Sequence, residues 1–114
     1  MRVPRRFLLG GQAWRVKWLR RGQDEWDEDA SVRGLLPYGE CSYSERLITL
    51  NPFANGDTQE KWDSFVHELL HAIDHYEEEK GTKGWHLPHA VISRLAGPLA
   101  AWMIENRVSI PEPK

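Results

Sequence analysis

Residues 65–73 read Phe65-Val66-His67-Glu68-Leu69-Leu70-His71-Ala72-Ile73 and determine the fold expected for the rest of the chain. Histidines four residues apart on a helix lie on the same side, separated by about 6 Å of rise, so their imidazoles can converge on one tetrahedral metal ion. The glutamate between them would lie beside the open coordination position, where a general base for bound water is needed. The sequence therefore predicts a helix that carries half of a metal site and its base, Glu68.

Hydrophobic periodicity supports this helix and gives it two different sides. On a helical wheel, five apolar residues cluster within roughly 60° of Trp62, whereas His67 and His71 lie about 140° and 180° away. The five residues are Phe65, Val66, Leu69, Ile73 and Tyr76. The helix is therefore expected to bury one face and to present both histidines to a cleft.

Composition limits the classes of protein that need to be considered. A chain of 114 residues is long enough for one domain with a modest core, and its net charge of −2 gives no bulk attraction to nucleic acid or to an anionic membrane. The lone Cys41 excludes a disulfide framework and a cysteine-based zinc knuckle. The apolar run before Gly10-Gly11 is too short for the core of a signal peptide, and no run approaches a membrane span. We therefore expect a cytoplasmic protein without a membrane segment.

Two pairs of short strands are expected before the helix. The first pair covers residues 7–9 and 12–19 and turns at Gly10-Gly11, with apolar and basic residues alternating in its second strand. The second pair covers residues 38–43 and 46–50. Alternation of this kind predicts a sheet with one buried face.

The segment between the two strand pairs is less informative. Residues 22–29 are expected to form an acidic loop, and residues 32–36 are ambiguous between a helical turn and a strand. The expected fold class is α+β, with a small antiparallel or mixed sheet of three or four strands packed on two helices. All of it is expected to form a single domain over residues 1–114.

Two helices are expected in the second half of the chain. The histidine helix should cover about 58–80, between a capping-box-like start at Asp57 and a stop at Gly81. The second should cover about 88–106, with a kink at Gly97-Pro98. Its expected buried stripe consists of Val91, Ile92, Leu95, Leu99, Trp102 and Met103.

A zinc hydrolase also needs a third protein ligand. His75 lies about 12 Å along the helix axis from His67, too far to share one ion, and the glutamates that follow on the same helix fail on reach. The candidates left are His89 in the first turn of the second helix, His86 in the loop before it and, more remotely, Glu105. The connection is long enough to fold back and set the second helix against the histidine face.

Other side chains have candidate roles around such an ion. His86 could donate a hydrogen bond to the substrate oxyanion instead of binding metal. Asp74 follows His71 by three residues, so it could accept the other imidazole N–H and fix the ring, or it could be a plain surface aspartate. Further candidate partners for the oxyanion, among which spacing does not choose, are Arg94, Tyr76, Tyr38 and Tyr43.

Two segments of the chain resemble a known family. Leu47-Ile48-Thr49-Leu50-Asn51, followed by His67-Glu68-Leu69-Leu70-His71-Ala72-Ile73-Asp74, is similar to the small zincin-like metallopeptidases of phages and prophages, which are similar to the ImmA/IrrE and SprT-like families. The resemblance covers residues 38–106. It implies three or four strands before the histidine helix and a second helix after it.

The resemblance also bears on the third ligand. In ImmA/IrrE-like proteins a glutamate opens the second helix and binds the metal, and an apolar residue, an alanine and a leucine follow at fixed spacing. Counting back from Leu95, Ala96 and Leu99 leads to His89. The resemblance therefore implies His89 in place of that glutamate, as in the SprT-like HExxH…His arrangement.

What the resemblance implies about activity is a zinc-dependent metallopeptidase. One Zn²⁺ per chain would be held by His67, His71 and His89, with Glu68 as the general base. A protein or peptide substrate would lie extended along an edge strand, either 38–43 or 46–50. The expected location is the cytoplasm of a bacterial host or a phage-infected cell.

Two other functions are open at this point. One is a zinc-binding regulatory or host-interaction protein of a phage or prophage that acts by contact and not by catalysis. The other is a SprT-like protease acting on DNA-associated proteins, in which the basic segment Arg2 to Arg21 would contact phosphates while Trp14 and Trp18 stack on bases. The near-neutral net charge gives this last function little support.

Overall fold

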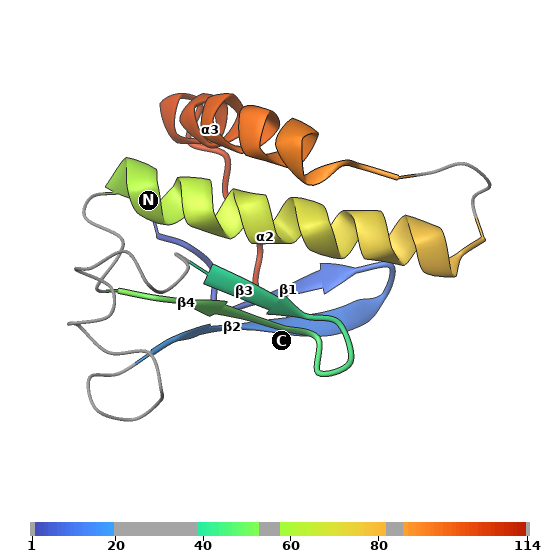
Figure 1. Ribbon diagram of the computed structural model, residues 1–114. Helices are drawn as coiled ribbons and strands as arrows, with labels where there is room; N and C mark the ends of the chain where they lie inside the picture. Colours follow the sequence, from blue (N-terminus) through green and yellow to red (C-terminus); the bar gives the residue numbers. More distant parts are fainter. Residues whose placement is uncertain (1, 20–38, 53–57, 82–85, 114) are drawn as a thin grey trace.

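The computed structural model describes residues 2–19, 39–52, 58–81 and 86–113 (Figure 1). Within them lie four strands and two helices: β1 Arg6–Leu9, β2 Gln12–Trp18, β3 Gly39–Ser42, β4 Leu47–Leu50, α2 Thr58–Glu79 and α3 His89–Glu105. The expected α+β class is therefore confirmed. The expected acidic loop, the ambiguous segment 32–36 and the cap at Asp57 lie outside the described residues.

The four strands form one mixed sheet in the order β1-β2-β4-β3. Strand β1 pairs with β2 and β3 pairs with β4, both antiparallel, while β2 and β4 run parallel in the centre. The hairpin between β1 and β2 turns at Gly10 and Gly11, whose φ angles of 59° and 80° suit a two-residue turn that needs positive φ. Strand β3 therefore lies at one edge of the sheet formed by the described strands.

Helix α2 lies between the sheet and α3, so the molecule has three layers (Figure 1). Its core side rests on the sheet through Trp62, Phe65 and Val66, all fully buried together with Ile48 and Leu50. The ring of Phe65 makes edge contacts with those of Phe7 and Trp62, with centroids 5.9 and 5.7 Å apart. These buried aromatic and aliphatic contacts hold α2, and with it the histidine pair, at a defined position over the sheet.

The burial of α3 differs from the expectation. Of the six residues expected to pack on the core, only Ile92 and Met103 are buried, and Ala96 and Ala100 fill the rest of the contact. Val91, Leu95, Leu99 and Trp102 are exposed. Small side chains let two helices approach closely, so α3 packs on α2 through its alanine face. The larger apolar face is turned roughly 100° away on the helical wheel.

After α3 the chain returns across α2 to the sheet (Figure 1). Val108 and Ile110 pack against the core, and the backbone N–H of Arg5 donates a hydrogen bond of 2.8 Å to Glu112 Oε1. Neither of the two described helices combines the length and the apolar character that crossing a bilayer requires.

Candidate metal centre

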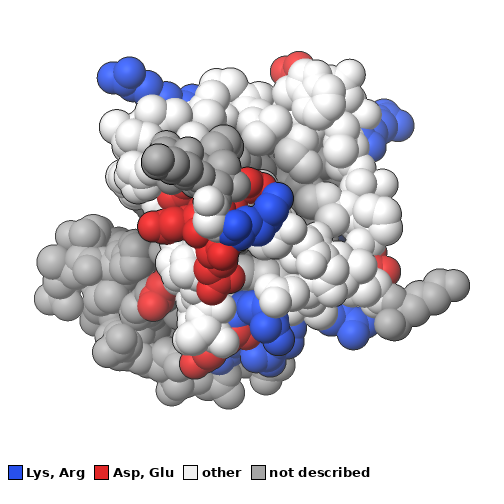
Figure 2. Space-filling view, turned by 90° about the vertical axis from the view of Figure 1, so that its right-hand side faces the viewer, with Lys and Arg blue, Asp and Glu red and all other residues white. Residues whose placement is uncertain are grey.

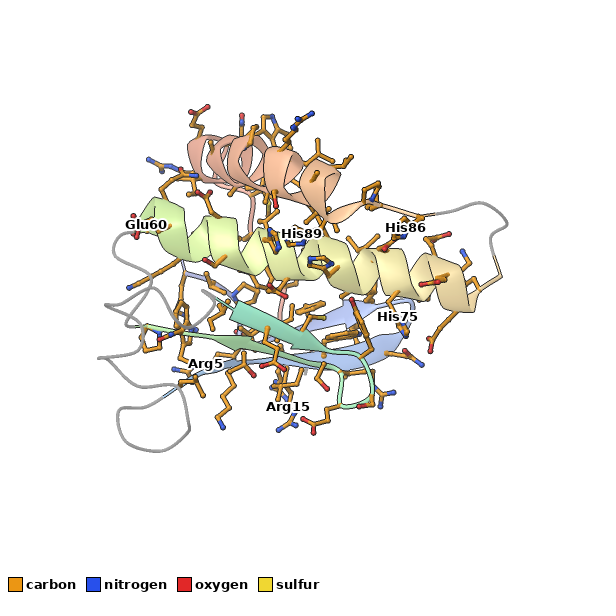
Figure 3. All side chains as sticks on the ribbon, in the orientation of Figure 1. Arg5, Arg15, Glu60, His75, His86 and His89 are labelled. Atoms are coloured by element: carbon orange, nitrogen blue, oxygen red, sulfur yellow. The ribbon has the colours of Figure 1, made fainter. Side chains whose placement is uncertain are left out.

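Three histidines from two helices converge above the middle of α2. His67 and His71 lie one turn apart on α2, and His89 is the first residue of α3, which crosses above them (Figure 3). One ring nitrogen from each lies within 4.8 Å of the other two, and the Nε2 atoms of His67 and His71 are 3.2 Å apart. The structure therefore brings together the three residues that the sequence suggests as a ligand set.

This donor set fits a zinc ion. A tetrahedral zinc with Zn–N distances of about 2.0–2.1 Å requires ligand nitrogens about 3.4 Å apart, close to the spacing of His67 and His71. His89 is the exposed member of the cluster, and one of its ring nitrogens lies within 4.8 Å of a ring nitrogen of each of the other two histidines. Three imidazoles leave a fourth position open, as in catalytic rather than structural zinc sites.

The protonation of the cluster also suits a metal. Burial, followed by the neighbouring histidines, lowers the pKa of His67. Burial and His89 likewise lower the pKa of His71, against a smaller opposing effect of Asp74. Neutral imidazole is the form that binds metal, so both side chains stay in the form that could bind an ion to a lower pH than a free histidine does.

Glu68 is held next to the cluster in a buried position. Only 8 % of this residue is exposed, and burial, with a smaller effect from Glu40, raises its pKa to about 7. Gly39 of β3 leaves room for it, because a Cβ at that position would lie 3.2 Å from Glu68 Cγ and 3.0 Å from Leu50 Cδ2. A carboxyl group poised near neutral pH is suited to proton transfer.

The histidines and Glu68 line one cleft of about 470 Å³. Its walls come from α2, α3 and the first residue of the edge strand β3. The lining residues are Gly39, Asp63, Ser64, His67, Glu68, His71, His89, Ser93, Ala96 and Gly97. Four of these residues are not expected from the sequence: Gly39 and the polar residues Asp63, Ser64 and Ser93. Of these, Ser93 had a signal, because it follows His89 by four residues and so shares its side of the helix.

Asp74 is buried and links α2 to the segment that leads into α3. Its Oδ1 accepts a 2.8 Å hydrogen bond from the backbone N–H of Leu87, and its Oδ2 lies 3.6 Å from His86 Nδ1. Of the two alternatives for Asp74, the plain surface aspartate is wrong because the residue is buried, and its hydrogen-bond partner is Leu87. His86 itself is 69 % exposed and lies towards the C-terminal end of α2, away from the cluster (Figure 3). Asp74 therefore fixes the backbone at Leu87, two residues before His89, against α2.

Removing the Asp74 carboxylate should weaken metal binding. We expect Asp74→Ala to bind zinc about tenfold more weakly, as is typical when a group that orients a ligand is lost, because Leu87 and the start of α3 lose their anchor. Asp74→Asn keeps an acceptor oxygen and should lose less. Competition with a chromophoric chelator measures the affinity, with His86→Ala as the control expected to match wild type. Wild-type affinity in Asp74→Ala would contradict this role.

The remaining sequence candidates lie away from the cleft. His75 stacks on Tyr43 with ring centroids 4.0 Å apart and lies 3.1 Å from Glu79. The ring of Tyr76 lies over Gly10 at the hairpin turn, and Arg94 is exposed on α3. Neither these residues nor Glu105 is among the described residues that line the cleft, and Tyr38 lies outside the described part of the chain.

The C-terminal end of α2 has no part in the cluster. Figure 2 shows acidic side chains gathered at this end, where α2 finishes with Glu77, Glu78 and Glu79. Lys80 lies 3.4 Å from Glu77, and Gly81 has a φ of 79°, so the helix stops where a glycine with positive φ can end it. Glu78 and Glu79 are exposed and Glu77 is half-buried, and none of the three belongs to the three-histidine cluster.

The basic N-terminal segment offers little for base stacking. Trp14 is only 4 % exposed and stacks on Phe7 inside the core, with ring centroids 5.9 Å apart. Trp18 is half-buried, with the Lys61 ammonium 5.9 Å from the centre of its ring. A stacking platform for single strands needs open aromatic faces, which Trp14 does not have.

Comparison of the chain with protein-family models, with curated proteins and with solved structures finds no match. The features of this chain that bear on its function are therefore the three histidines, Glu68 and the cleft that they line.

Proposed function

We propose that this chain is a zinc-dependent metallopeptidase of the small zincin-like kind that its HExxH segment resembles. The observation that supports this most is the convergence of His67, His71 and His89 with a buried Glu68 in one cleft. The chemistry of the proposal is hydrolysis of a peptide bond, with one zinc ion per chain. On this proposal the protein works in the cytoplasm of a bacterial host or phage-infected cell.

The roles of the side chains follow from their chemistry. His67, His71 and His89 would hold the ion, and bound zinc would acidify a water and polarise the substrate carbonyl. Glu68, with a pKa raised to about 7, takes a proton from the attacking water and passes it to the leaving amine. Burial of this carboxyl in the cleft wall keeps it from losing its proton to bulk solvent too early.

The edge strand β3 is the natural place for a peptide. Among the described strands β3 pairs only with β4, and its first residue, Gly39, lines the cleft. A peptide added to an exposed strand edge forms backbone hydrogen bonds along its length, which holds it extended irrespective of its side chains. We propose that the substrate adds to β3 in this way, so that its scissile carbonyl reaches the cluster beside Glu68.

The test is a metal-controlled peptidase assay. Protein stripped with a chelator and reloaded with zinc should bind about one ion per chain by elemental analysis. It should then cleave an unfolded protein substrate or a random peptide library, with cleavage sites identified by mass spectrometry. The stripped protein should be inactive, and zinc should restore activity.

Two results would contradict the proposal. A protein that binds zinc but cleaves no member of the library favours the contact-only function. If the protein binds no zinc after reloading, neither the metallopeptidase nor the zinc-binding regulatory protein is supported.

A further inference from the structure

Helix α3 exposes a row of large apolar side chains that the fold does not use. Val91, Leu95, Leu99 and Trp102 are 37, 47, 37 and 55 % exposed, and they recur every three or four residues along one face. We call these four residues the α3 stripe. No described residue covers them. They account for four of the six large hydrophobic residues exposed in the described part of the chain.

The α3 stripe contrasts with the face that α3 buries. The helix packs on α2 largely through Ala96 and Ala100, while its leucines and its tryptophan face outward. A patch on the order of a few hundred Å² is about as large as apolar patches on monomers become, and patches of that size commonly mark interaction sites. Figure 2 shows few charged side chains over α3, which carries only Arg94 and Glu105 as strong charges.

The α3 stripe lies on the opposite flank of α3 from the metal cleft. His89, Ser93 and Gly97 line the cleft, and on a helical wheel they are centred roughly 160° from the stripe. The buried residues Ile92, Ala96 and Ala100 lie between the two sides. A partner bound to the stripe therefore leaves the cleft open.

The two charges on α3 indicate which partner fits. Arg94 and Glu105 lie on the same outer edge of the stripe, one near each end, and neither forms an ion pair with a described residue. In an antiparallel pair of identical helices, Arg94 of each copy comes opposite Glu105 of the other, and Leu95 comes opposite Trp102. In a parallel pair the same edge of each copy would lie on opposite sides of the interface, so Arg94 and Glu105 would have no opposite charge facing them. The stripe is thus complementary to itself about a twofold axis.

We propose that the α3 stripe is the interface of an antiparallel homodimer, in which α3 packs against α3 of a second copy. One helix from each side buries less than the roughly 800 Å² per partner of a standard interface. The dimer is therefore weak and exchanges with monomer in the micromolar range. Each dimer carries two metal clefts that face away from the interface.

The first test is the oligomeric state across a concentration series. Sedimentation equilibrium on the purified protein should show a reversible monomer–dimer equilibrium. Leu95→Glu and Trp102→Glu should each raise the dissociation constant at least about 30-fold, because each places a charge in the apolar centre of both copies. Leu8→Glu is the matched control, since Leu8 is 59 % exposed but lies on β1, and it should dimerise like wild type. Thermal unfolding checks that each variant remains folded.

The second test determines whether the two copies of α3 pack antiparallel or parallel. Arg94→Glu and Glu105→Arg should each weaken the dimer by about fivefold, since both interfacial pairs become repulsive. An equal mixture of the two variants should dimerise like wild type, because opposite charges then meet again. The double variant Arg94→Glu/Glu105→Arg should also recover.

Three results would overturn the proposal. The first is that the protein stays monomeric at millimolar concentration. This result would overturn the dimer even if a different partner were found to bind the α3 stripe. The second is a dimer that Leu8→Glu weakens while Trp102→Glu does not. The third is a pair of charge reversals that leave the dissociation constant unchanged. None of these outcomes depends on zinc or on hydrolysis, so the test is independent of the proposed function.

Discussion

Replacing Glu68 with glutamine is expected to reduce the rate of peptide hydrolysis by about 1,000-fold. The substitution removes the only buried carboxyl that lines the described part of the cleft and leaves an amide that cannot take a proton. General acid–base groups typically contribute factors of about 10² to 10⁴, and this one would serve both the attacking water and the leaving amine. The turnover number should fall while the zinc content stays near one per chain.

The same variant should be more stable than wild type once metal is removed. The pKa of Glu68 is raised from 4.5 to about 7, so folding disfavours its ionised form. The Glu68 carboxyl therefore contributes to stability in its protonated form. This contribution is fully present below about pH 4.5 and is lost as the pH rises through 7. Glutamine avoids this loss and should raise the free energy of unfolding by about 3 kcal/mol at pH 8 and by little at pH 4.5.

Urea unfolding in chelator at the two pH values measures this difference. Because the histidines are common to both proteins, their own pH dependence cancels in the comparison. A variant that loses activity together with zinc, or that is less stable at pH 8, would indicate that Glu68 has a structural role. In that case the loss of hydrolysis would no longer identify it as the base.

Zinc should raise the melting temperature of the wild-type protein by about 15 to 30 °C. A ligand at about 1,000 times its dissociation constant adds about 4 kcal/mol to the stability of the folded state. In a domain of this size each kcal/mol moves the melting temperature by about 4 to 8 °C. His89→Ala should lose most of this increase, because the ion would then be held by α2 alone. His86→Ala should keep it, since His86 is exposed and lies outside the cluster.

Calorimetric melting curves with and without zinc measure the shift. His67→Ala serves as the positive control for a lost ligand. The three-histidine site would be wrong if His89→Ala responded to zinc like wild type. Loss of the response in His86→Ala would move the third ligand to the loop before α3.

Local patterns in the sequence predicted the local parts of the structure. The spacing of His67 and His71 and the apolar repeat around Trp62 indicated a helix with a metal-binding side, and Gly10-Gly11 indicated the turn between β1 and β2. These features depend on neighbours within a few residues. The parallel pairing of β2 with β4 depends on contacts across some thirty residues, about which periodicity says nothing.

The errors have the same origin. The expected stripe of α3 followed the largest apolar residues, but the close approach of α2 selects the face with Ala96 and Ala100. For Asp74 the sequence leaves open an orienting contact with His71 or a plain surface position, and neither suggests its hydrogen bond with Leu87, which is 13 residues away. The space that Gly39 leaves for Glu68 depends on two elements meeting, so it had no local signal.

The packing of α3 through alanines also affects the order in which parts of the molecule unfold locally. Each buried alanine methyl group contributes less than a leucine would, so α3 gains less from its buried face than a leucine-lined helix of the same length would. An ion bound by α2 and by the first residue of α3 would cross-link the two helices at the N-terminus of α3. Without this cross-link, we expect α3 to be the first element to detach in local unfolding, while α2 stays packed on the sheet.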